Sequence, residues 1–95
     1  MTTIPEQFDA AVADALDPIL DAALAEGRLA GGVALVAKGG KLVYARAAGL
    51  ADVESKRPMS RDAIFLAASL TKPIVTAAFL SLVEDGVMGM DDPIT

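Results

Sequence analysis

Apolar residues recur at helical spacing near the start of the chain. Between residues 8 and 24 they follow one another at steps of three and four, with aspartates between them, so the pattern predicts one amphipathic surface helix laid on a sheet. Its apolar positions are Phe8, Ala11, Val12, Ala15, Leu16, Ile19, Leu20, Ala23 and Leu24. Pro18 either kinks this helix or opens a second piece capped by Asp17, and Gly27 is a natural C-terminal stop.

Two short apolar segments with β-branched residues follow, at residues 33–37 and 42–45. A Lys-Gly-Gly-Lys run at residues 38–41 separates them, and this spacing predicts a β-hairpin with a glycine turn. The two glycines do not form a phosphate-binding loop, because no helix start and no G-x-x-x-x-G-K-S/T spacing accompany them. Residues 48–62 turn polar, which predicts a connection over the surface.

The last third of the chain holds its most apolar segment. Residues 63–68 are apolar and lead into a Ser-Leu-Thr-Lys-Pro run at residues 69–73. Residues 74–83 contain only Thr76 and Ser81 as polar interruptions, so they predict a helix that is apolar on every face. Such a helix is typical of the middle of a large protein, and one amphipathic helix with one hairpin cannot surround it.

Composition and charge exclude several classes of function. The 95 residues make at most one small domain, yet 54% of them are apolar, against about 45–50% in ordinary globular proteins. With 13 acidic and 8 basic residues and a formal net charge of -5, the basic surface of a nucleic-acid-binding protein is missing. No apolar run is long enough to span a membrane, and residues 1–7 lack the features of a signal peptide. We therefore expect a cytoplasmic chain without nucleic-acid or membrane partners.

The chain contains no histidine and no cysteine. Histidine is the base of Ser-His-Asp and Cys-His sites and the commonest metal ligand, while cysteine supplies thiolates, disulfides and structural zinc sites. We therefore expect neither a metal nor another cofactor. A serine nucleophile in this chain would need a different base.

Ser69 and Lys72 supply such a pair. At a helix entrance, a separation of three residues places both side chains on one face, within reach of each other. A serine hydroxyl needs an adjacent base, and desolvation together with the positive end of the helix macrodipole favours a neutral lysine amine over the ammonium. Unpaired backbone N–H groups at the same helix start would face the oxyanion of a tetrahedral intermediate.

The same spacing also has a purely structural interpretation. Ser-x-x-Lys is expected by chance about 0.3 times in a chain of this length, with Ser69 as an N-cap and Lys72 as a solvated residue of the first turn. Two features favour chemistry instead. A lysine in the first turn opposes the macrodipole, and Pro73 disfavours helical geometry at Lys72, which predicts an irregular helix entrance.

Several short motifs follow one another along the chain. They are Gly31-Gly32-Val33, Gly39-Gly40-Lys41, Gly49-Leu50-Ala51-Asp52, Arg57-Pro58-Met59, Phe65-Leu66-Ala67-Ala68-Ser69-Leu70-Thr71-Lys72-Pro73, Glu84-Asp85-Gly86 and Asp91-Asp92-Pro93-Ile94. Their order, over nearly all of residues 5–95, resembles the N-terminal part of the serine β-lactamase superfamily, in which Ser-x-x-Lys is catalytic. The nearest branch is the class C-like one, which holds class C β-lactamases, D-alanyl-D-alanine peptidases and β-lactamase-like carboxylesterases. Ser-Leu-Thr-Lys-Pro most resembles the esterases.

The resemblance implies an α/β fold, the α+β sandwich of the β-lactamase and penicillin-binding-protein type. Residues 1–95 would be its N-terminal part, with the first helix, the first β-hairpin and the buried helix that bears the nucleophile. It implies that Ser69 is acylated and that Lys72 is its base or base partner. The family's Tyr-x-Asn or Tyr-x-Ser motif and its third motif lie further downstream, and Tyr44 in the hairpin cannot replace the motif tyrosine. We expect the remainder of the domain in the same polypeptide or in a second chain.

The function expected from this resemblance is that of a serine hydrolase that forms an acyl-enzyme. A carboxylesterase acting on short acyl esters fits best, with a small-molecule ester or amide as substrate and an inactive isolated fragment. A β-lactamase or D-alanyl-D-alanine peptidase is the alternative within the class. From another class, the alternative is a non-catalytic α/β module that associates through its apolar surface, as a homo-oligomer or with a partner.

Overall fold

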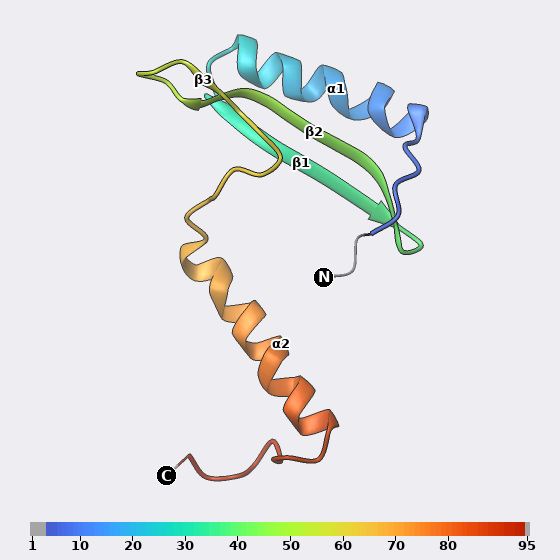
Figure 1. The fold of residues 1–95 in the computed structure, drawn as a ribbon, viewed down its shortest axis with the longest axis vertical. Coiled ribbons are helices and arrows are strands. Elements are labelled where there is room, and N and C mark those ends of the chain that lie inside the picture. The colour runs from blue at the N-terminus through green and yellow to red at the C-terminus, as the bar shows by residue number, and fades with distance from the viewer. Residues whose placement is uncertain (1–3, 95) are drawn as a thin grey trace. The chain divides into compact units, whose positions relative to one another are not determined.

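The computed structural model describes residues 4–94 in two compact units, the first as far as Ala63 and the second from Ile64 onward. The elements in chain order are α1 (Ala10–Ala25), β1 (Gly31–Lys38), β2 (Lys41–Asp52), β3 (Arg57–Pro58), the 3₁₀ helix η1 (Ala68–Leu70) and α2 (Thr71–Glu84) (Figure 1). Helices and an antiparallel sheet give the chain the predicted mixed α and β character.

β2 is the central strand of the first unit. It pairs antiparallel with β1 on one side and with β3 near its end, in the order β1-β2-β3. The segment before α1 also joins β2, because the Gln7 amide donates to the Leu42 carbonyl at 2.9 Å and the Leu42 amide donates to the Pro5 carbonyl at 2.8 Å. β2 therefore has neighbours along both edges.

The predicted glycine hairpin is confirmed. Gly39 and Gly40 have φ of 59° and 75°, and a two-residue turn that matches strand twist needs positive φ at both positions. The surface connection predicted from residue 48 was wrong in its first part, because β2 continues to Asp52 and pairs with β3. The polar residues there form a second turn, in which the Asp52 carboxylate accepts the Glu54 amide at 3.1 Å and the Ser55 hydroxyl at 2.9 Å.

α1 packs on β2 and runs through Pro18 without a break. Asp9 caps it by accepting the Ala11 amide at 2.9 Å, so Phe8 lies outside the helix, and Asp17 is not a cap. The predicted stop is confirmed: Gly27 has φ of 73°, and the Arg28 amide donates to the Ala23 carbonyl at 2.9 Å. Pro18 lies on the exposed side, where the carbonyl that it leaves unbonded can meet water.

The core of the first unit is small. Among residues 4–63, three apolar residues are buried, namely Ala23, Leu42 and Tyr44. Phe8 and Ile19, both assigned to the apolar face by their spacing, are 58% and 62% exposed. The helical period alone therefore overestimated the face that α1 buries.

The second unit is built around α2, the predicted apolar helix. It ends as α1 does, because Gly86 has φ of 77° and the Val87 amide donates to the Leu82 carbonyl at 3.0 Å. None of its residues is buried, and Ile74 is 66% exposed. The second unit, as far as residue 94, does not supply the burial expected of this helix, because an apolar helix needs packing elements on all sides and α2 is the main element of its unit. No helix in this described part is long and apolar enough to cross a membrane.

Candidate active site

Ser69 lies in η1 and Lys72 in the first turn of α2. η1 leads directly into α2, since the Leu70 amide donates to the Ala67 carbonyl at 3.0 Å and Leu70 itself has helical φ of -64°. The residue that precedes α2 is Leu70, and no side chain caps the helix. The interpretation of Ser69 as an N-cap is therefore wrong.

The irregular helix entrance predicted from Pro73 is present, although at another residue. Ala68, immediately before Ser69, has φ of 48°, in the left-handed region that costs a residue with a Cβ about 1–2 kcal/mol. Lys72 is helical although Pro73 follows it, and Pro73 itself is tolerated because the first turn of a helix does not use the N–H that proline lacks. The strain thus lies next to the candidate nucleophile.

The backbone amide of Ser69 is a possible oxyanion donor at this entrance. Among residues 4–94, the amide of Ser69 has no acceptor, whereas the amides of Leu70 and Thr71 donate to the carbonyls of Ala67 and Ala68. The several free amides expected from the sequence are thus reduced to that of Ser69 at these three positions. A single amide at the nucleophile is one half of the usual pair of oxyanion donors.

The structure places Ser69 and Lys72 one helical turn apart, without a hydrogen bond between Oγ and Nζ. Both residues are exposed. In the described part of the chain, Lys72 forms no ion pair, since all four ion pairs there involve arginines. The Lys72 carbonyl accepts the Thr76 hydroxyl at 2.8 Å. The Lys72 amine thus has no acidic partner among the described residues. These residues also leave the amine in solvent, whereas a neutral lysine is favoured by burial away from water.

Two other serines differ from Ser69. The Ser55 hydroxyl donates to Asp52, and the Ser60 hydroxyl oxygen accepts the Asp62 amide at 3.1 Å. Both belong to turns of the first unit, and neither precedes a helix with a lysine one turn on. They serve as matched controls for Ser69.

Tyr44 belongs to a network that the sequence analysis missed. Its hydroxyl donates to Asp17 Oδ1 at 2.6 Å, the same oxygen accepts Arg46 Nη1 at 3.2 Å, and Arg46 Nη2 pairs with Asp21. The hydrogen bond to Asp17, together with burial, raises the pKa of Tyr44. Asp17 and Asp21 are four residues apart and therefore lie on one face of α1. Tyr44 and Arg46 are two residues apart and lie on one face of β2. These spacings are the sequence signal that could have predicted the network.

Among residues 4–94, no group of three or more Asp, Glu, His or Cys side chains is placed to hold a metal ion. The candidate site of this chain therefore consists of Ser69, Lys72 and the backbone of the helix entrance.

Comparison with known proteins identifies the family of this chain. The Beta-lactamase family model matches residues 12–95, which include Ser69 and Lys72. Esterase EstB of Burkholderia gladioli is 51% identical over 86 residues, which are 90% of this chain and 22% of that esterase. Penicillin-binding protein 4* of Bacillus subtilis is 35% identical over 63 residues, 66% of this chain and 14% of that protein. No solved structure matches. The chain spans less than a quarter of the length of these relatives, and it belongs to the Beta-lactamase family.

Proposed function

We propose that this chain carries the nucleophile and the base of a serine hydrolase, a carboxylesterase that acts on short acyl esters through an acyl-enzyme. The observation that carries the proposal is the pair Ser69 and Lys72, one turn apart at a strained helix entrance, within a Beta-lactamase family match. The 51% identity with a protein named an esterase favours an ester substrate.

The proposed chemistry has two steps. Ser69 Oγ attacks the ester carbonyl carbon while its proton passes to the neutral Lys72 amine, and the alkoxide then leaves with a proton from the resulting ammonium. In the second step, water attacks the acyl carbon while its proton passes to the Lys72 amine; the bond from the acyl carbon to Ser69 Oγ then breaks, Oγ takes the proton back and the acid is released. The free Ser69 amide donates to the carbonyl oxygen as it becomes negative. Desolvation of Lys72 and a second oxyanion donor are assigned to residues outside this chain, so the isolated chain is expected to be inactive.

Two alternatives have an observation in their favour. The 35% identity with a penicillin-binding protein favours a β-lactamase or D-alanyl-D-alanine peptidase, in which the same serine would attack an amide. The exposed apolar residues of α2 favour a non-catalytic module that associates through them. The cytoplasmic location expected from the sequence stays a prediction.

A fluorophosphonate probe on the complete protein tests the proposal. We expect one adduct, mapped by mass spectrometry to Ser69, that disappears in Ser69→Ala and persists in the control Ser60→Ala. An activated short acyl ester should then give a burst, whereas a chromogenic cephalosporin should give none. An adduct that persists in Ser69→Ala, or that maps elsewhere, contradicts the proposal. A burst with the cephalosporin alone would favour the β-lactamase alternative.

A further inference from the structure

A second candidate site lies in the first unit, apart from Ser69 and Lys72. A cleft of about 520 Å³ opens between the segment before α1 and the β1–β2 turn, with Gln7, Phe8 and Asp9 on one side and Lys38, Lys41 and Val43 on the other. Small-molecule pockets have volumes of about 300–1,000 Å³. The cleft is therefore large enough for a small ligand.

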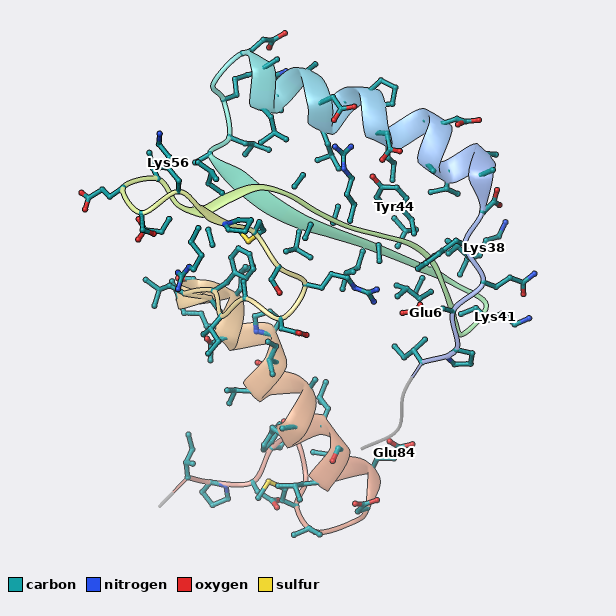
Figure 2. The ribbon with its side chains drawn as sticks, turned by 45° about the horizontal axis from the view of Figure 1, so that its top comes forward. Glu6, Lys38, Lys41, Tyr44, Lys56 and Glu84 are labelled. Atoms are coloured by element: carbon teal, nitrogen blue, oxygen red, sulfur yellow. The ribbon has the colours of Figure 1, made fainter. Side chains whose placement is uncertain are left out.

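The cleft carries positive charge that the chain does not neutralise. Lys38 and Lys41 are direct cross-strand partners at the end of the hairpin (Figure 2), and like charges opposite each other destabilise a strand pair. Among residues 4–94, neither lysine forms an ion pair, and Lys41 Nζ donates only to the neutral Gln7 Oε1 at 2.9 Å. An anion between the two amines would remove their repulsion.

The other residues that line the cleft indicate the polarity and the charge of the ligand. Phe8 is 58% exposed, and Val43 is half-buried beside it, so part of the wall is apolar. Asp9 contributes the single acidic group, and its Oδ1 is already bonded to the Ala11 amide. Two lysines and one aspartate leave a single net positive charge, which matches a monoanion better than a phosphate monoester.

We propose that this cleft binds an aliphatic monocarboxylate. The carboxylate lies between Lys38 and Lys41, and the aliphatic chain lies along Phe8 and Val43. Exposed ion pairs are individually weak, so both the charge and the apolar contact are needed for measurable affinity. The proposal rests on the cleft alone and does not depend on the hydrolase activity.

Equilibrium dialysis of the complete protein against radiolabelled octanoate tests it. We expect octanoate to bind, and acetate, which lacks the apolar chain, and octylamine, which reverses the charge, to bind about tenfold more weakly. The double variant Lys38→Gln/Lys41→Gln should weaken octanoate binding about tenfold. The matched control Lys56→Gln removes an exposed lysine outside the cleft and should leave binding unchanged. Raising NaCl from about 0.05 M to about 0.5 M should weaken binding as well.

Three results would overturn the proposal. Equal binding of octylamine would show that charge plays no part, and full octanoate binding by the double variant would assign it to other apolar surfaces, including α2. If the protein sediments with phosphatidylcholine vesicles but does not bind octanoate, the lysines and Phe8 contact a lipid surface instead. Circular dichroism checks the hairpin in the double variant. If that variant has lost the hairpin, Phe8→Ala decides, because it leaves the turn intact and must also weaken octanoate binding about tenfold.

Discussion

The two units of the chain satisfy their side chains in opposite ways. In the first unit, a modest set of apolar residues buries Leu42 and Tyr44, and hydrogen bonds from Tyr44 and Arg46 tie α1 to β2. In the second unit, the apolar residues of α2 are spread over every face of the helix, yet α2 buries none of its residues. The difference shows that α2 is formed by local signals, since its stop at Gly86 repeats the stop of α1 at Gly27.

The same difference bears on the proposed chemistry. Every group assigned to catalysis lies in the unit that is not enclosed, and a lysine base needs a dry environment. In the first unit, Tyr44 and Arg46 are bonded to aspartates of α1, whereas the second unit presents Ser69 and Lys72 exposed. We therefore expect the chemistry of this chain to depend on surfaces supplied from outside it, and the stability of its sheet to depend on its own residues.

The largest expected effect is at Lys72 in the complete protein. If Lys72 is the base, Lys72→Arg should lower ester turnover about as much as Lys72→Ala, by about 10²–10⁴, because a guanidinium cannot give up its proton to become a base. Steady-state kinetics with an activated ester measures this loss. Lys56→Arg is the control and should keep full turnover. Arginine that restores most of the activity at Lys72 would mean that only positive charge is required there.

The second largest expected effect is self-association of the chain through α2 and not through the first unit. The exposed face of α2 should make the 95-residue chain associate in a concentration-dependent way and bind a hydrophobic dye, because Ile74 and Val75 are 66% and 62% exposed. Ile74→Gln/Val75→Gln should lower the associated fraction several-fold in analytical ultracentrifugation. Ile19→Gln, which removes an exposed apolar residue of α1, is the matched control and should change it little. A cooperative, monodisperse monomer of the unaltered chain would contradict the interpretation of α2.

The sequence predicted the features that depend on local signals, and it did not predict those that depend on tertiary contacts. Local signals were sufficient for the glycine turn at residues 39–40 and for the stop of α1 at Gly27, since each depends on a backbone conformation that glycine adopts at no steric cost. They failed where tertiary contacts decide: the Asp17–Tyr44 bond joins residues 27 apart. The spacing of Ser69 and Lys72 was readable, whereas the left-handed backbone at Ala68 was not, because alanine gives no signal for it.

Backbone strain provides a finer test. Ala68 and Lys56 both have positive φ, at 48° and 57°, so Ala68→Gly and Lys56→Gly should each raise the free energy of unfolding of the complete protein by about 1 kcal/mol. Only Ala68→Gly should also lower turnover, because it loosens the backbone that holds Ser69. Urea denaturation and steady-state kinetics measure the two effects. Equal kinetics in both variants would make the strain at Ala68 purely structural.

The Tyr44 network gives a smaller, pH-dependent effect in the first unit. Its hydrogen bond to Asp17 raises the pKa of Tyr44, so its stabilising contribution is complete below about pH 10, the ordinary tyrosine pKa. That contribution should be lost as pH rises through the raised pKa. Tyr44→Phe should therefore lower the urea midpoint at neutral pH and abolish this alkaline loss, as followed by circular dichroism. An unchanged midpoint at neutral pH would show that Arg46 alone holds α1 on β2.

The smallest expected effect is at the turn before β3. The Ser55 hydroxyl, followed by the Glu54 amide, lowers the pKa of Asp52, so the stability that this carboxylate contributes is present above its unfolded pKa of about 3.9 and is lost as pH falls through the folded value. Ser55→Ala should raise the pKa of Asp52 toward that unfolded value and shrink the acid-side loss, as measured by carboxyl-carbon NMR titration. Ser60→Ala, which removes a hydroxyl bonded only to the Asp62 amide, should leave the Asp52 titration in place. Identical Asp52 titrations in the Ser55→Ala variant and the unaltered chain would show that backbone amides alone hold the carboxylate, and would weaken the view that the first unit satisfies its polar groups through its own side chains.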